Sequence, residues 1–122
     1  MATQDISSAQ FNDIISDNDI VIIDFWAEWC GPCKSFAPTY EKVSERHEDI
    51  VFAKVNTESE QELAAHFQIR SIPTLMVFRE QVVLFAQPGM LSEEQLEDVI
   101  TKIKDVDMAK VHEEIAQQEQ QS

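Results

Sequence analysis

The apolar residues of the chain change their spacing several times, and each change marks an expected element. From Ile20 to Ala27 the chain is almost continuously apolar and rich in β-branched and aromatic residues, which is typical of a strand covered on both faces. Residues 50–55 repeat this pattern, and residues 33–47 place apolar side chains at helical spacing between the two strands. These segments predict a βαβ unit, with shorter helices expected at residues 8–16 and 60–67.

The second half of the chain predicts a hairpin followed by a helix. The strand patterns of Thr74–Phe78 and Val82–Ala86 are separated by three residues, too few for the crossover that a parallel pair requires. They therefore form an antiparallel pair. Ser92 and Gln95 then have the spacing of a capping box, which opens a helix. The expected fold class is an α/β sandwich in which helices flank a mixed central β-sheet on both faces.

Beyond Lys104, apolar residues continue at helical spacing among acids and glutamines, with no glycine or proline to end the preceding helix. We expect a core domain over residues 1–104 and an acidic, helical C-terminal extension over residues 105–122 whose end frays. The extension either packs on the domain or forms a partner or dimer surface, so the chain is expected to be a monomer or a weak dimer. The apolar positions concerned are Met108, Val111 and Ile115.

Composition and charge restrict the class of protein. The chain has 122 residues, of which 43% are hydrophobic, enough for the core of one domain. Its net charge of -14 repels phosphate backbones and anionic membrane surfaces, so neither nucleic acid nor membrane is an expected partner. Its apolar runs are far shorter than the roughly 20 residues that span a bilayer. The first residues lack the basic and apolar regions of a signal peptide, which indicates a cytoplasmic protein.

Two cysteines lie three positions apart, where the first long strand pattern meets a helix. Cys30 falls at the expected helix start, where unpaired N–H groups and the positive end of the helix dipole stabilise a thiolate and lower its pKa. Cys33 lies one turn further along and is placed to resolve a mixed disulfide. Gly31 lets a substrate backbone approach, and Pro32 supplies a helix-ready φ angle. This arrangement predicts dithiol–disulfide exchange, in which Cys30 attacks and Cys33 resolves.

Three alternative roles for the cysteine pair fit the sequence less well. A structural zinc site requires four ligands, and the three histidines show no paired spacing that would complete one, so no metal is expected. A static disulfide over so short a loop would stabilise little, and a reducing cytosol would open it. Two unrelated thiols would not account for the flanking tryptophan, glycine and proline. The histidines are His47, His66 and His112.

The chain resembles the thioredoxin family in two separate motifs. The stretch Asp24-Phe-Trp-Ala-Glu-Trp-Cys-Gly-Pro-Cys-Lys34 is similar to the active-site signature of the family, and Ile69-Arg-Ser-Ile-Pro-Thr74 is similar to its second signature. The resemblance spans about residues 4–104. It implies the thioredoxin fold and an oxidoreductase with a redox-active Cys30–Cys33 disulfide and no further cofactor. The Gly-Pro pair resembles that of reductants more than that of oxidants or isomerases.

The resemblance also implies partners and a cellular role. The expected substrates are disulfide-containing proteins, and the expected recycling partner is a flavin-dependent thioredoxin reductase. Electron transport and cell redox homeostasis are the corresponding processes. A protein of another class, a non-catalytic client-binding or holdase module that uses the family's docking surface and the C-terminal extension, is the alternative.

Asp24 is the one acid in the first long strand pattern. Burial of an unpaired charge is costly, so this carboxyl must be neutral or paired, and Lys54 in the neighbouring strand pattern is the expected partner. The resemblance implies that the acid lies beneath the resolving cysteine and accepts its proton. We therefore expect Asp24 and Lys54 to take part in catalysis, unless Asp24 points to solvent at the end of the strand.

The resemblance places a substrate-binding surface around the cysteines. It implies that Pro73 follows a cis peptide bond, faces the cysteine pair and leaves the backbone of Ile72 free to pair with an extended substrate. Gly89 and Met90 are expected at a neighbouring turn. Ser71 and Gln81 depart from the family pattern, which has glycine at the corresponding turns. The predicted substrate-binding residues together form the docking surface, which consists of Trp29, Gly31, Pro32, Ile72, Pro73, Gly89 and Met90.

Overall fold

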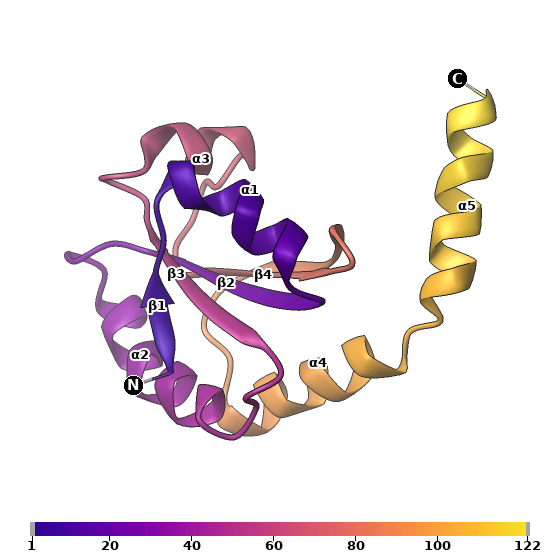
Figure 1. Ribbon diagram of the computed structural model, residues 1–122. Coiled ribbons are helices and arrows are strands. Elements are labelled where there is room, and N and C mark those ends of the chain that lie inside the picture. Colours follow the sequence, from indigo (N-terminus) through magenta and orange to yellow (C-terminus); the bar gives the residue numbers. More distant parts are fainter. Residues whose placement is uncertain (1, 122) are drawn as a thin grey trace.

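The computed structural model describes residues 2–121 and contains a mixed five-stranded sheet, with strand order β1-β3-β2-β4-β5 (Figure 1). The first three of these strands are parallel, and β4 and β5 join them as an antiparallel hairpin, which confirms the mixed sheet expected from the sequence. The sequence does not predict β1, because three residues are too few to show an alternation. The strands are β1 Thr3–Asp5, β2 Ile20–Trp26, β3 Val51–Asn56, β4 Thr74–Arg79 and β5 Val82–Pro88.

Helices cover both faces of the sheet, as the apolar runs predict (Figure 1). Apolar residues of α1 and α3 pack on one face, and those of α2 and α4 pack on the other. None of the helices within residues 2–121 has the length and apolar character needed to cross a bilayer. The helices are α1 Ser8–Asp17, α2 Gly31–Ser44, α3 Gln61–His66, α4 Glu93–Asp105 and α5 Met108–Gln121.

The central strand β2 owes its continuous apolar run to burial on both sides. Ile20 and Ile22 belong to the cluster beneath α2 and α4, whereas Val21, Ile23 and Phe25 belong to the cluster beneath α1 and α3. Side chains alternate between the two faces of a strand, so neither face of β2 can be polar without a buried polar group. Asp24 is the single exception, and it lies on the α2 face.

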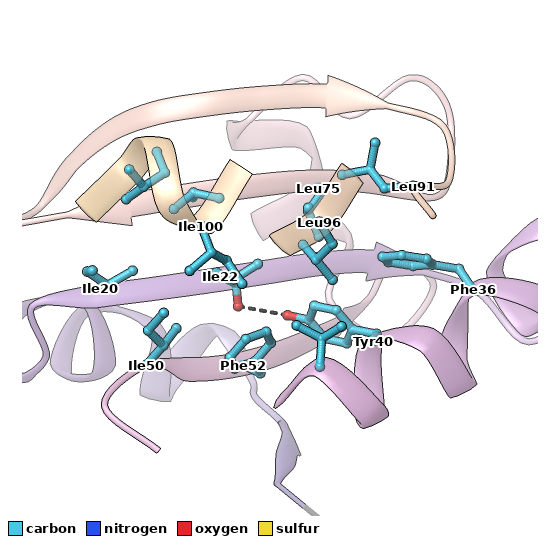
Figure 2. Packing of buried hydrophobic residues seen from close by; sticks show 13 residues of the cluster. Ile20, Ile22, Phe36, Tyr40, Ile50, Phe52, Leu75, Leu91, Leu96 and Ile100 are labelled. Carbon is cyan, nitrogen blue, oxygen red and sulfur yellow. Dashed lines mark hydrogen bonds between the residues drawn. The ribbon is translucent and has the colours of Figure 1, made fainter. Parts of the chain in front are cut away.

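Tyr40 attaches α2 to the sheet. Its side chain is fully buried, and its hydroxyl lies 2.9 Å from the carbonyl oxygen of Ile22 in β2 (Figure 2). The carbonyl oxygen of Ala53 in β3 lies 2.8 Å from the same hydroxyl. Its neighbours on the same face of α2 include Cys33 and Phe36, which are also buried. The third turn of α2 is therefore held over two strands, and this contact sets the position of the first turn, where the cysteines lie.

The helix α4 ends at Asp105, although no glycine or proline interrupts the sequence there. Arg79 from the end of β4 supplies the reason, because its Nη1 lies 2.8–3.2 Å from three carbonyl oxygens in the last turn and C-cap of α4 and donates to them. The Oδ1 of Asp107 then accepts from the N–H of Lys110 at 3.2 Å and opens α5, which follows α4 after a bend in the chain (Figure 1). The first half of α5 contacts the β4–β5 turn, where His112 Nε2 lies 3.0 Å from Glu80 Oε1. Ser122, at the end expected to fray, lies outside the described residues. The three acceptors are the carbonyl oxygens of Ile103, Lys104 and Val106.

Candidate functional site

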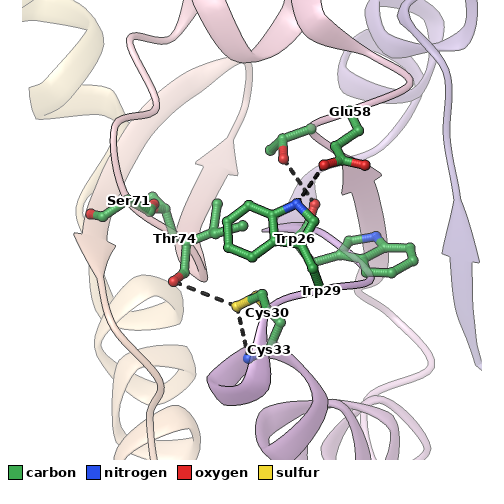
Figure 3. The surroundings of a disulfide bond; sticks show 9 residues. Trp26, Trp29, Cys30, Cys33, Glu58, Ser71 and Thr74 are labelled. Carbon is green, nitrogen blue, oxygen red and sulfur yellow. Dashed lines mark hydrogen bonds between the residues drawn. A yellow bond between two sulfur atoms is a disulfide. The ribbon is translucent and has the colours of Figure 1, made fainter.

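Cys30 is the N-cap residue of α2, at the place where β2 passes into the helix. Its backbone is extended, with φ -86° and ψ 109°, and its Sγ accepts a hydrogen bond from the N–H of Cys33 at 3.2 Å (Figure 3). The two cysteines form a disulfide whose Cα atoms lie 5.2 Å apart, and each is 3% exposed. Pro32 falls in the first turn, where its missing N–H costs no hydrogen bond. The structure thus places Cys30 at the helix start predicted from the sequence.

A second loop borders the disulfide. The carbonyl oxygen of Ile72 lies 3.7 Å from Cys30 Sγ, and the Ile72–Pro73 peptide bond is cis, as the family resemblance implies. A third loop joins them, because the N–H of Gly89 donates to the carbonyl oxygen of Pro73 at 2.8 Å. The strand register explains this meeting: Thr74 is paired both with Phe25 near the end of β2 and with Pro88 at the end of β5.

The docking surface is open to solvent over most of its members. Trp29 is 68% exposed and Met90 is 47% exposed, while Ile72 is half-buried between the disulfide and solvent. Pro73 is buried, so its part in the surface is to position the neighbouring loop through its carbonyl group. The remaining members, Gly31, Pro32 and Gly89, are exposed.

Sequence reasoning missed one residue beside this surface. Glu58 follows β3 and accepts a hydrogen bond from the indole Nε1 of Trp29. Its own backbone is fixed by Asn56, whose Oδ1 accepts from the Glu58 N–H at 2.9 Å. In the sequence Glu58 belongs to a run of alternating acids that indicates only a solvated exterior, and no local pattern connects it with a residue 29 positions away.

Asp24 is buried in the middle of the molecule rather than turned to solvent. It is 1% exposed, and neither carboxyl oxygen has a hydrogen-bond partner within residues 2–121. Burial raises the pKa of Asp24 from 3.8 to about 7, and the positive charge of Lys54 opposes part of this rise. The carboxyl lies on the face of β2 covered by α2. Burial raises the pKa of the Tyr40 hydroxyl, and the charge of Asp24 adds to this rise. A carboxyl group of this kind exchanges its proton near neutral pH.

Lys54 lies next to Asp24 in the sheet but does not form the ion pair that the sequence suggests. The two residues are in register on β2 and β3 and therefore share one face. The ammonium group is 4.7 Å from the centroid of the Trp26 ring, a cation–π contact, and Asp24 is left without a bonded partner among the described residues. The reason is geometric: the long lysine side chain places its charge over the indole at the rim of an open pocket. Lys54 consequently acts on Asp24 through space.

Comparisons with known proteins agree with this geometry. The family model described as Thioredoxin matches residues 2–102. A relative from Streptomyces coelicolor described as "Putative thioredoxin 2" is 51% identical over 121 residues, covering 99% of this chain and 90% of the relative. Among solved structures, a Plasmodium falciparum thioredoxin has a TM-score of 0.76 and 38% identity, covering 81% of this chain and 97% of that one. A mutant thioredoxin from Halobacterium salinarum has a TM-score of 0.79 and 31% identity, covering 85% and 92%.

Proposed function

The chain belongs to the thioredoxin family and is a thiol–disulfide oxidoreductase, and from this premise we propose that it reduces protein disulfides through its Cys30-Gly31-Pro32-Cys33 motif. The observation that carries the proposal is the position of Cys30 as N-cap of α2, with the N–H of Cys33 directed at its sulfur. In the reduced protein the same N–H and the helix dipole favour a thiolate on Cys30.

The first step is attack by the Cys30 thiolate on one sulfur of the substrate disulfide. A bond forms between Cys30 Sγ and that sulfur, the substrate S–S bond breaks, and the leaving thiolate takes a proton from solvent. The docking surface holds the substrate chain beside Cys30, with the backbone of Ile72 pairing with it as an added strand. Exposed Trp29 and Met90 supply apolar contact at this point.

The second step releases the substrate and requires a base. Cys33 lies on the buried face of α2, on the side of the sheet to which Asp24 belongs. We propose that Asp24 is the base that accepts the proton of the Cys33 thiol, either directly or through a water molecule. The Cys33 thiolate attacks Cys30 Sγ, and the bond between Cys30 Sγ and the substrate sulfur breaks. The substrate sulfur leaves as a thiolate and takes up a proton, and the Cys30–Cys33 disulfide present in this structure forms. In the complete cycle the substrate has gained two electrons and two protons.

Lys54 tunes the base. Its positive charge keeps the pKa of Asp24 lower than burial alone would, so the carboxylate form is available near neutral pH.

The family's general partners are disulfide-containing substrates and a thioredoxin reductase. We propose that a flavin-dependent reductase returns the two electrons to the Cys30–Cys33 disulfide. The proposed compartment is the cytoplasm, the proposed state is a monomer or a weak dimer, and residues 105–122 are proposed to form an extension to the 1–104 domain.

The proposal is tested by reduction of insulin with dithiothreitol as the electron donor. Cys33→Ser is expected to remove turnover. When this variant is reduced, freed of dithiothreitol and mixed with insulin, it should accumulate a mixed disulfide between Cys30 and the substrate, visible on a non-reducing gel. Ser35→Ala, at an exposed position of the same helix, is the matched control and should turn over normally. Insulin binding that persists without any reduction by the unmodified protein would favour the holdase alternative.

The role of Asp24 is tested separately. Asp24→Asn is expected to slow the resolution of a preformed mixed disulfide. The deficit should grow from about pH 6 to pH 8 as the carboxylate of the unmodified protein forms, and should narrow towards pH 9, where hydroxide can remove the proton without Asp24. The rate is measured by rapid mixing and acid quench. Equal resolution rates across this range would remove Asp24 from the mechanism and leave the reductase assignment intact.

A further inference from the structure

The side chain of Met90 is the most accessible sulfur-containing group within residues 2–121 of the disulfide form. Met90 is 47% exposed, whereas Met76 and Met108 are each 6% exposed. Cys30 and Cys33 are each 3% exposed, and their sulfurs are already bonded to one another. An oxidant that reaches the disulfide form from solvent therefore meets the thioether of Met90 first.

The backbone next to Met90 is tied to the loop that borders the disulfide. On one side, Gly89 has φ +97°, a left-handed conformation that favours glycine, and is bonded to the carbonyl of Pro73. On the other side Leu91 is buried, and Ser92 is the N-cap of α4. Met90 is therefore an exposed residue between two residues whose positions are fixed by a hydrogen bond and by burial. Met90 is a member of the predicted docking surface, as is Trp29, which is 68% exposed.

We propose that Met90 is a modification site at which a hydroperoxide controls the docking of protein substrates, an inference that rests on the reductase function proposed above. The thioether sulfur attacks one oxygen of the hydroperoxide, the O–O bond breaks and a sulfoxide forms. The sulfur loses two electrons, and the hydroperoxide is reduced to water or an alcohol. No further reactant is needed.

The sulfoxide changes the affinity of the docking surface. A thioether is apolar and flexible, and it suits a surface that must fit several partners. A sulfoxide is polar, and docking would take it out of water without a fixed hydrogen-bond partner. This cost predicts a KM for a protein disulfide that is roughly tenfold higher, with kcat little changed. A small disulfide that reaches Cys30 without covering Met90 should be reduced as before.

The test uses the full chain in its disulfide form, so that the cysteines are protected during oxidation. The protein is treated with hydrogen peroxide and freed of peroxide. Reduction of insulin is then assayed with dithiothreitol as the electron donor. Reduction of dithiobis-nitrobenzoate is followed as a single turnover of protein that has been reduced and freed of dithiothreitol, because dithiothreitol reduces this compound directly. Peptide mass spectrometry locates the added oxygen. Met90→Leu, which has no thioether at this position, is treated in parallel, and each protein is compared with its own untreated sample.

The outcomes that support the inference differ from those that overturn it. Support requires that Met90 gains its oxygen before Met76 and Met108, and that kcat/KM for insulin falls about tenfold while reduction of the small disulfide is kept. In Met90→Leu the ratio of treated to untreated activity should stay near one. Slower oxidation of Met90 than of the two buried methionines, or unchanged insulin reduction by fully oxidised Met90, would overturn it. Failure of the untreated protein to reduce insulin would instead count against the proposed function.

Discussion

The buried carboxyl of Asp24 should make the stability of the folded protein depend on pH in a specific direction. Its pKa is 3.8 in an unfolded chain and about 7 in the folded protein. The folded state holds the proton of Asp24 more tightly than the unfolded chain does. The contribution of Asp24 to the free energy of unfolding is therefore largest below pH 3.8 and is lost as the pH rises towards 7. Relative to low pH, the free energy of unfolding lost through Asp24 is about 1.7 kcal/mol at pH 5, where only the unfolded chain ionises this group, and about 4 kcal/mol at pH 8.

Asp24→Asn removes this cost, since the amide does not ionise. The free energy of unfolding of the disulfide form is measured by urea titration at pH 5 and pH 8, with tryptophan fluorescence as the signal. The advantage of the variant over the unmodified protein is expected to be about 2.5 kcal/mol larger at pH 8 than at pH 5. Any cost of burying the amide is the same at both pH values and cancels in this comparison.

Asp13→Asn serves as the control because it removes a carboxylate of the same type from an exposed position of α1. Its difference from the unmodified protein should not change with pH by more than about 0.5 kcal/mol, as is usual for surface substitutions. If Asp24→Asn behaves like Asp13→Asn, the carboxyl does not titrate near neutral pH, and the reasoning from its burial is wrong.

Three further predictions concern the backbone and the C-terminal extension. Gln68 and Gln81 have φ 55° and 70°, so Gln68→Gly and Gln81→Gly should each raise the free energy of unfolding by about 0.5–1 kcal/mol; a loss in urea titration would contradict the strain argument. Arg79→Ala should cost about 2–3 kcal/mol because the last carbonyls of α4 lose their donor, and a change under 0.5 kcal/mol would refute the cap. Truncation after Lys104 should leave cooperative unfolding and cost about 1–3 kcal/mol, because the buried Met108 is lost. Non-cooperative unfolding of that fragment would place the extension inside the folding unit.

Local patterns are enough to locate the main elements and the reactive pair. The apolar run from Ile20 to Ala27 predicts a central strand that is covered by helices on both sides, and the structure contains this strand. The position of Cys30 follows from the same step, because the strand pattern stops and the helical spacing starts around it. Burial of Asp24 is also foreseeable, since a residue inside a two-sided strand has no route to solvent.

Contacts between distant segments cannot be predicted in the same way. The sequence pairs Lys54 with Asp24, but a register between strands gives only the shared face, and the side chain turns to Trp26 instead. The partnership of Glu58 with Trp29 joins two loops that no spacing connects. The end of α4 depends on Arg79, which comes from the far end of β4.

The division has a physical reason. Hydrophobic periodicity and helix caps act over a few residues. The helices and strands, the thiol pair and the buried acid can therefore be predicted from the sequence. Burial then raises the pKa of that acid, but the size of the rise depends on which side chains the completed core brings around it, and so does the choice of partner for each long charged side chain. Such groups have several reachable partners of similar energy, and packing across the whole sheet selects among them.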